Sequence, residues 1–232
     1  MHIDVESKPS YGMAVVHLDD GETIIAESGS MVAMTDDIDV STEFNGTGGA
    51  GFMGKVKAVL AGLARKVLGG ESMFVNHYTA EEDDQRVMLA PAMVGDVLDI
   101  EMSKRPIYVQ ATSFLAATPD VVVQLVWGGW SMLFSGEGAF FLKCRGKGGR
   151  LLLNCYGALE EIDVDGSFAV DSGHLVAYKG KLKYSIRKVG GWKSTLLSGE
   201  GLVLEFNGKG KIWLQTRNFG SLVSWITPQL PN

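Results

Sequence analysis

The chain carries one phrase twice: GGWSMLFSGEG at residues 128–138 and GGWKSTLLSGEG at residues 190–201. A looser copy, GGESMF, stands at residues 69–74. The Gly-Glu pairs of the three copies are spaced by 66 and 63 residues. Self-similarity at a nearly fixed spacing indicates a repeated structural unit. We therefore expect three copies of one unit of roughly 60 residues.

A second phrase also occurs three times, and we call it the ESG phrase. ESGSMVA at residues 27–33 matches DSGHLVA at residues 171–177, and QATSFLA at residues 110–116 is a weaker version. The two kinds of phrase alternate along the chain, so the units interleave rather than follow one another end to end. The expected repeat cores cover approximately residues 12–116, 128–178 and 190–227.

Alternation of apolar and polar residues predicts β-strands in each unit. Residues 139–145 and 150–156 form the clearest case, an expected hairpin with a Gly-rich turn between its strands. Shorter hairpins are expected around Asp165-Gly166, residues 208–210 and Asp20-Gly21. The chain has 30 glycines but 6 prolines, so glycine is expected to mark turns between many short strands.

One stretch departs from this pattern and predicts an amphipathic helix near residues 55–68. The basic residues bordering its apolar stripe are Lys55, Lys57, Arg65 and Lys66. The helix is expected to pack on a sheet, with contact to an anionic membrane surface as the alternative. The expected fold class is all-β, a single domain over residues 1–232 built of three related subdomains with this helix inserted in the first copy.

Composition and charge limit the class of protein. Apolar residues make up 46% of the chain and charged residues 21%, which excludes a wholly disordered chain. No apolar run reaches the length of a transmembrane helix. The net charge is −6, and it divides into −11 over residues 1–100 and +5 over residues 101–232. Halves of opposite charge favour a head-to-tail contact between copies.

Cysteine usage and the first residues indicate the compartment. In the symmetric register of the expected hairpin, Cys144 lies opposite Leu151 and Cys155 lies opposite Phe140, too far apart for a disulfide. We expect two free, buried thiols. Residues 1–8 have neither the basic region nor the apolar region of a signal peptide. The sequence therefore predicts a cytoplasmic location.

No pattern predicts a cofactor or a metal. GTGGAG at residues 46–51 fits a dinucleotide motif, and residues 49–55 fit part of a phosphate-binding loop. Val56, however, replaces the hydroxyl residue that binds magnesium, and no βαβ pattern follows. The four histidines, which have no metal-ligand spacing, are His2, His17, His77 and His174.

No catalytic constellation emerges either. Asp171, Ser172 and His174 are triad residue types, but neighbours in a strand point to opposite faces, so a turn is the better interpretation. The recurring glutamates between glycines are interpreted as caps of backbone N–H groups at a bend, with ligand or acid roles as the alternative. These structural repeat residues are Gly70, Glu71, Gly136, Glu137, Gly199 and Glu200.

A basic strip is the last candidate. Lys179, Lys181 and Lys183 alternate with apolar and aromatic residues, so the lysines share one strand face. Bases could not stack on aromatic rings that point to the opposite face, and the whole chain is acidic, so no stable nucleic-acid complex is expected. This strip and the basic border of the 55–68 helix are the candidate interaction surfaces.

Several of these motifs together resemble the altered-inheritance-of-mitochondria family. They are GGAGFMGK at residues 48–55, GGESMFVN at 69–76, SGEG at 135–138, ESGSMV at 27–32 and IWLQT at 212–216. The resemblance spans nearly the whole chain. It implies three β-sandwich subdomains, of a short double-stranded β-helix kind, like those of the tryptophan RNA-binding attenuator protein. It implies no catalytic residues and no cofactor.

Three functions follow as hypotheses. The leading one is a non-enzymatic scaffold or binding protein that forms homo-oligomers, because open β units leave edges that neighbouring subunits close. The second is a peripheral membrane or anionic-polymer (RNA) binding protein. The third is a small-molecule enzyme with a pocket in a β-roll.

Overall fold

The computed structural model describes residues 1–44, 74–127, 140–188 and 202–230. Over these residues, sixteen strands form three sheets of four, six and six strands, which confirms the expected all-β fold class. Among them, α3 (Phe219–Ile226) is the one α-helix. The helix expected near residues 55–68 lies outside the described residues.

The strands of each sheet pair in antiparallel order, and their bounds are as follows. The first sheet is β1 (His2–Glu6), β2 (Met13–Leu18), β7 (Gln85–Leu89) and β4 (Met31–Met34). The second sheet is β5 (Ile38–Phe44), β6 (Phe74–Ala80), β3 (Thr23–Glu27), β10 (Phe114–Ala117), β13 (Arg150–Asn154) and β8 (Val97–Glu101). The third sheet is β11 (Val122–Trp127), β12 (Phe140–Arg145), β9 (Ile107–Gln110), β15 (Leu175–Lys188), β16 (Leu202–Gln215) and β14 (Leu159–Asp171).

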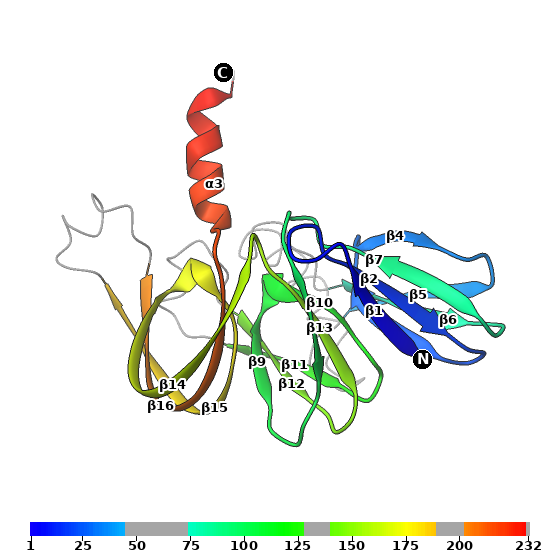
Figure 1. The fold of residues 1–232 in the computed structure, drawn as a ribbon, viewed down its shortest axis with the longest axis horizontal. Coiled ribbons are helices and arrows are strands. Elements are labelled where there is room, and N and C mark those ends of the chain that lie inside the picture. Colours follow the sequence, from blue (N-terminus) through cyan, green and yellow to red (C-terminus); the bar gives the residue numbers. More distant parts are fainter. Residues whose placement is uncertain (45–73, 128–139, 189–201, 231–232) are drawn as a thin grey trace, which may run out of the picture.

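The molecule is elongated (Figure 1). The first sheet lies at one end, and the long strands β14, β15 and β16 lie at the other. The short helical turns are η1 (Ala111–Ser113), η3 (Ser172–His174) and η4 (Thr227–Gln229). Helix α3 extends away from the sheets, and none of its residues is buried.

Apolar side chains from the three sheets form three cores. One core lies between the first and second sheets, and a second lies between the second and third sheets. Strand β13 serves both, because Leu152 faces the first core while Leu151 and Leu153 face the second. Each fully buried leucine stabilises the fold by about 1.5–3 kcal/mol. The unbroken run of leucines is therefore a strand covered on both faces.

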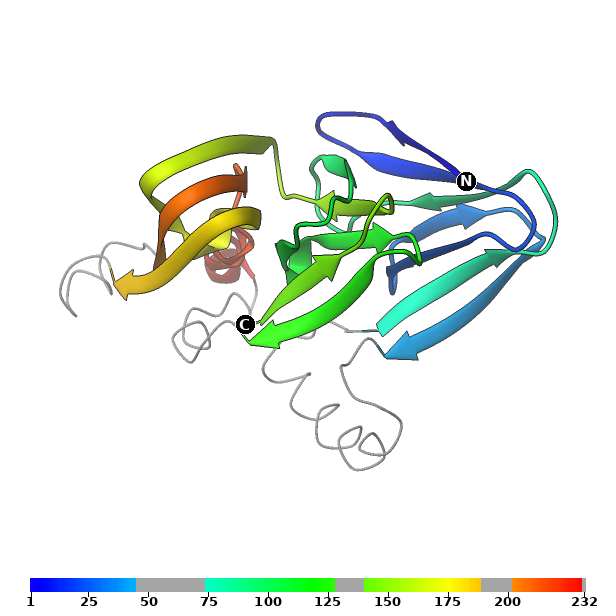
Figure 2. The ribbon, with the colours of Figure 1, turned by 90° about the horizontal axis from the view of Figure 1, so that it is seen from below.

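The third core lies within the third sheet, where β14, β15 and β16 curl over their own length (Figure 2). The bends fall at glycines with positive φ: +113° at Gly166, +107° at Gly180 and +127° at Gly208. Gly166 pairs with Gly208, and Gly180 pairs with Gly210. A Cβ on Gly208 would lie 2.2 Å from the carbonyl oxygen of Lys181. Glycine thus permits both the backbone conformation and the close approach of the strands.

These bends correct two of the expected hairpins. Asp165-Gly166 and residues 208–210 were predicted to be hairpin turns. Both predictions are wrong, because β14 and β16 bend at these positions and continue without reversing direction. Bending without reversing keeps the ladder between β14 and β16 continuous from Leu159 to Asp171.

The hairpin expected from residues 139–156 is also wrong. Strand β12 lies in the third sheet and β13 in the second, and they do not pair with each other. Both strands carry apolar residues on both faces: Phe141 faces the third core and Leu142 the second. A lone hairpin would bury only one face, whereas strands in two sheets bury both. The hairpin expected around Asp20-Gly21 fails likewise, because β2 and β3 lie in different sheets.

Cys144 and Cys155 are free, and both are buried in the core between the second and third sheets. This confirms the prediction of unbonded thiols, although the hairpin register from which it was drawn is wrong. Burial raises the pKa of the Cys144 thiol to about 12. The side chain is therefore a neutral, apolar part of the core.

Candidate functional site

The lysine strip lies on the outer face of β15. Lys181 and Lys183 are exposed and Lys179 is half-buried, while Tyr178, with its ring toward the third core, is buried. The alternation expected from the sequence is therefore present. Tyr178 and Trp213 are almost wholly buried. Neither ring is available for stacking with a nucleic-acid base.

Strand β16 adds two lysines to the same face. Lys179 pairs with Lys211 and Lys181 with Lys209 in the strand register. The two lysines of β16 are engaged by acids of β14. Lys209 Nζ lies 2.9 Å from Asp165 Oδ2, and Lys211 Nζ forms an ion pair with Glu161. The hydrogen bond from Lys211 lowers the pKa of Glu161, so this carboxylate stays ionised.

The lysines of β15 differ from those of β16. Lys179 Nζ lies 5.0 Å from the centre of the Trp213 ring, a cation–π contact. Within the described part of the chain, no ion pair involves Lys181 or Lys183. These two ammonium groups are therefore the part of the strip best able to meet an external anion.

The other sequence-predicted site residues lie outside the described residues. They are Lys55, Lys57, Arg65, Lys66, Gly70, Glu71, Gly136, Glu137, Gly199 and Glu200. The three stretches that contain them join β5 to β6, β11 to β12 and β15 to β16. Each of these strand pairs is antiparallel. All three stretches therefore connect two strands that are direct neighbours in a sheet.

The triad-like residues form a structural turn. The Asp171 carboxylate accepts a hydrogen bond of 2.9 Å from the backbone N–H of Gly173, which caps η3. His174 Nδ1 lies 2.7 Å from the carbonyl oxygen of Gln215. Ser172 is buried. The aspartate therefore organises the backbone and is not aligned with the histidine for proton transfer.

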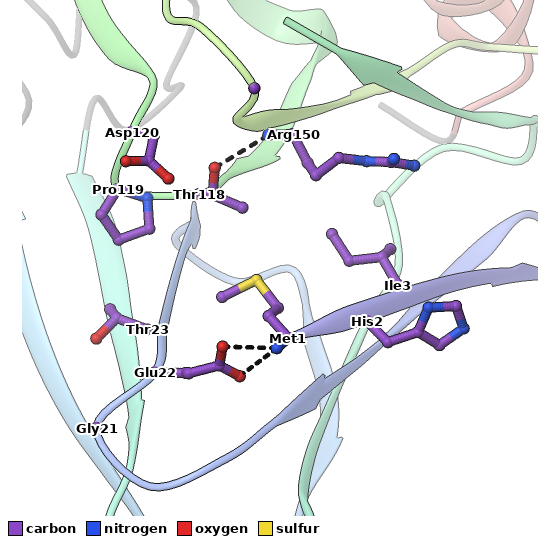
Figure 3. Close-up of a pocket in the computed structure, with 11 residues that line it drawn as sticks. Met1, His2, Ile3, Gly21, Glu22, Thr23, Thr118, Pro119, Asp120 and Arg150 are labelled. Atoms are coloured by element: carbon purple, nitrogen blue, oxygen red, sulfur yellow. Dashed lines mark hydrogen bonds and ion pairs between the residues drawn. The ribbon is translucent and has the colours of Figure 1, made fainter.

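A cleft of about 510 Å³ lies between the first strand and the loops beside β3, β10 and β13 (Figure 3). The amino group of Met1 donates a hydrogen bond of 2.6 Å to Glu22. A backbone hydrogen bond from Asp19, followed by the one from Met1, lowers the pKa of Glu22. The Arg150 backbone N–H donates to Thr118 Oγ1 at 3.0 Å, and its guanidinium binds Asp99. This cleft could not be predicted from the sequence, because its lining comes from distant segments.

Two charged side chains of this cleft, Glu22 and Arg150, are each held by an oppositely charged partner. Glu22 is held ionised, and the arginine is committed to a carboxylate. Such groups neither donate nor accept a proton readily near pH 7. Over the residues that the structure describes, no cluster of three or more His, Cys, Asp or Glu side chains could hold a metal ion.

The ESG phrase takes the same local form three times. It joins β3 to β4, β9 to β10 and β14 to β15. In every copy the second strand pairs with a β-bulge at its second residue, Val32, Leu115 or Val176. The strand before the phrase also pairs in one way, with β6, β12 and β16 respectively. The extents of the repeat cores, residues 12–116, 128–178 and 190–227, stay a prediction.

Strands of successive copies join at the ESG phrase. Strand β3 of the first copy pairs with β10 of the second, and β9 of the second pairs with β15 of the third. In the first junction Ala26 lies opposite Ala116. In the second junction Val109 lies opposite Ala177. The two junctions use the same positions. In each, the residue directly before one copy of the ESG phrase lies opposite the seventh residue of the next copy.

Strand β4 corresponds to β10 and β15, and strand β14 corresponds to β3 and β9. These four counterparts pair across a junction, whereas β4 and β14 lack such a partner in the described part of the chain. Within the residues that the structure describes, β4 pairs only with β7, and β14 pairs only with β16. The counterparts of β4 are covered, since Leu115 and Val176 are fully buried, whereas Met31, Val32 and Met34 are 41%, 57% and 39% exposed. We call the unpaired sides of these strands the β4 edge and the β14 edge, and they lie at opposite ends of the molecule (Figure 1).

The two edges were not among the sites predicted from the sequence. A signal was present, because the sequence of β4, MVAM, includes no charge that would protect an exposed edge. In the described part of the chain, no helix has both the length and the apolar character needed to cross a bilayer.

Proteins of Streptococcus pyogenes are similar to this chain in sequence and in structure. An uncharacterized protein of Streptococcus pyogenes serotype M6 is 26% identical over 233 aligned residues, covering 100% of this chain and 92% of that protein. A crystal structure of a Streptococcus pyogenes protein superposes with a TM-score of 0.79 at 24% identity, covering 99% of both chains, and this likeness supports the fold alone. The family model described as Mitochondrial biogenesis AIM24 matches residues 3–217. The resemblance found in the sequence is thereby confirmed, and the chain belongs to the AIM24 family.

Proposed function

We propose that this protein is a non-enzymatic scaffold or binding protein that associates with further copies of itself. The observation that carries the proposal is the β4 edge, a row of unpaired backbone groups flanked by exposed methionine and valine side chains. Natural proteins protect an open edge with lysine, proline, a covering element or a bulge. Among the described residues, the bulge is the one such feature found on β4, and the same bulge in β10 and β15 does not prevent pairing.

The absence of enzymatic activity is part of this proposal. It is supported by the cleft beside Glu22, where Glu22 and Arg150 are each engaged in an ion pair. The proposal also includes a cytoplasmic location, which is supported by the two free thiols. Cell fractionation tests the location, and recovery in a membrane or extracellular fraction would contradict it.

Size-exclusion chromatography with light scattering tests the self-association. We expect a mass of two or more copies of the 25.0 kDa chain at micromolar concentration. The mass should fall on dilution, because association depends on concentration. A 25.0 kDa species at every concentration up to the highest soluble one would overturn the proposal.

A second function, binding to an anionic surface or polymer, is favoured by the lysine strip. Lys181 and Lys183 are exposed and lie outside the ion pairs that engage Lys209 and Lys211. Charge-driven binding weakens as salt rises. We expect co-sedimentation with phosphatidylserine vesicles or RNA at low salt, lost in the variant Lys181→Ala/Lys183→Ala. The matched control is Lys209→Ala, which removes a charge already engaged by Asp165. Equal binding by both variants would contradict this function.

A further inference from the structure

The two internal junctions follow one register, and this register can be applied to the third copy. In the first junction Ala117 lies opposite Ile25, and in the second Tyr178 lies opposite Tyr108. Ala117 and Tyr178 directly follow the seventh residue of their ESG phrases. Ile25 and Tyr108 stand two residues before theirs. The tyrosine pair is stacked, with ring centres 4.9 Å apart.

The same positions exist on the two unpaired edges. The seventh residue of the first phrase is Ala33, followed by Met34, on the β4 edge. Val170 directly precedes the third phrase, and Ala169 precedes Val170, on the β14 edge. Ala169 is exposed on β14, as Met34 is on β4.

We propose that the β4 edge of one chain pairs with the β14 edge of a second copy, antiparallel, with Ala33 opposite Val170 and Met34 opposite Ala169. This inference rests on the proposed self-association and specifies its contact. The pairing would extend the first sheet of one copy with strands β14 and β16 of the next. It repeats between chains a junction that the chain already forms twice within itself.

Backbone hydrogen bonds on β4 agree with this pairing. The N–H of Thr35 donates to the carbonyl oxygen of Arg86 at 3.0 Å, toward β7. Neighbouring residues of an antiparallel strand direct their backbone groups to opposite sides. The N–H and carbonyl of Met34 therefore point to the free side. The second copy has the same bond, from Thr118 to Arg150 at 3.0 Å, and there the preceding Ala117 does pair across the junction.

Side chains and long-range charge also agree. The pairing would cover Met31, Val32 and Met34, and it would cover Phe168 of β14, which is 36% exposed. Residues 1–100 carry a net charge of −11 and residues 101–232 a net charge of +5. These opposite charges favour a head-to-tail orientation at long range. β14 itself carries five carboxylates and no base, so the contact depends on backbone pairing and apolar burial.

The contact uses different surfaces on the two partners. Each added copy brings one new β4 edge and one new β14 edge, so association continues until the rotation between copies closes a ring, or it produces an open filament. The smallest such ring is a dimer in which the β4 edge of each copy meets the β14 edge of the other. The proposal excludes a dimer that joins β4 to β4 or β14 to β14.

Cysteine cross-linking tests the register directly. Side chains opposite each other in an antiparallel pair have Cβ atoms about 4.5–5.5 Å apart, close enough for oxidation to link two cysteines. The double variant Met34→Cys/Ala169→Cys should give cross-linked species of two or more chains on a denaturing gel, extending to a ladder when three or more copies assemble. A mixture of the two single variants should give a covalent dimer and nothing larger. The control Met34→Cys/Val122→Cys places the second thiol on β11, where Val122 is 57% exposed, and should give no cross-linked species.

A second variant separates loss of assembly from loss of fold. Met34→Asp should reduce the assembly to 25.0 kDa chains while the circular dichroism spectrum and melting temperature stay those of the parent. Val122→Asp, on another edge strand, should leave the assembly intact. If the parent chain assembles but neither the 34–169 link nor the effect of Met34→Asp appears, this inference fails and the proposed self-association stands. If the parent chain is a monomer, both fail.

Discussion

Tyr108 stacks on Tyr178 across the junction between the second and third copies of the repeat, with ring centres 4.9 Å apart and planes within 7° of parallel. The two residues are paired in the strand register, so the contact joins β9 to β15 directly. Tyr178 also meets Phe141 edge-on and Phe206 at a tilt, at centre distances of 5.7 Å and 5.3 Å. This tyrosine thus links a strand junction to the third core.

Removing this ring should destabilise the protein strongly. Tyr178→Ala leaves a cavity among Tyr108, Phe141 and Phe206, and we expect the free energy of unfolding to fall by about 3–5 kcal/mol. Urea unfolding followed by circular dichroism measures the change. Tyr11→Ala is the control: Tyr11 is 72% exposed, so the expected change is within about 0.5 kcal/mol. Equal effects of the two variants would contradict the role given to Tyr178.

The glycine bends give a prediction that separates two kinds of cost. Gly166 and Gly208 lie opposite each other and have φ of +113° and +127°. A Cβ on Gly166 has nothing within 4 Å, whereas one on Gly208 would collide with the Lys181 carbonyl oxygen. Gly166→Ala should cost about 1–3 kcal/mol from backbone strain alone. Gly208→Ala should cost more, and thermal unfolding of both variants measures the difference. Equal melting temperatures would show that the collision is relieved without cost.

Alkaline pH should weaken the fold through Cys144. Burial raises the pKa of this thiol from 9.0 to about 12. Between these values the unfolded chain loses a proton that the folded chain keeps. The stability is therefore complete below pH 9 and is lost as pH rises, at about 1.4 kcal/mol per pH unit. Urea midpoints from pH 8 to 11 measure the fall. Cys144→Ala should show a shallower one, and an identical slope in both proteins would assign the loss to other groups.

Two ion pairs that differ in burial should differ in their contribution to the free energy of unfolding. Asp99 has a side chain only 11% exposed and binds Arg150 through Nε at 2.9 Å and through Nη2, whereas Asp165 and Lys209 are 77% and 80% exposed. Asp99→Ala leaves the guanidinium without its partner, and it should cost about 1–3 kcal/mol. Asp165→Ala should cost less than about 0.5 kcal/mol, because exposed pairs contribute little. Urea unfolding at low and high salt checks both values.

The class of fold could be predicted from the sequence because glycine and alternating apolar residues are local signals. The same signals misplaced the turns. Gly166 and Gly208 bend strands without reversing them, and nothing local distinguishes a bend from a hairpin, since both need a residue with positive φ. What decides is the partner strand, here the same pair of glycines facing each other.

Sheet membership was the harder part. The apolar run Leu151 to Leu153 fits one face of a hairpin and also a strand buried on both sides. Only the presence of a core on each side of the second sheet distinguishes them, and that depends on residues far away in the chain. The two strand edges were not predicted for a similar reason. The uncharged sequence of β4 is compatible with an exposed edge, but whether a neighbouring strand covers it depends on distant residues.

The third part of the chain differs from the rest in how it could open. In the first two copies a strand ends before the chain changes sheets, so two separate layers face each other and could slide or part. In the third copy β14, β15 and β16 each run unbroken through both layers. Because these three strands cannot part as two separate layers, we expect this region to unfold as one unit.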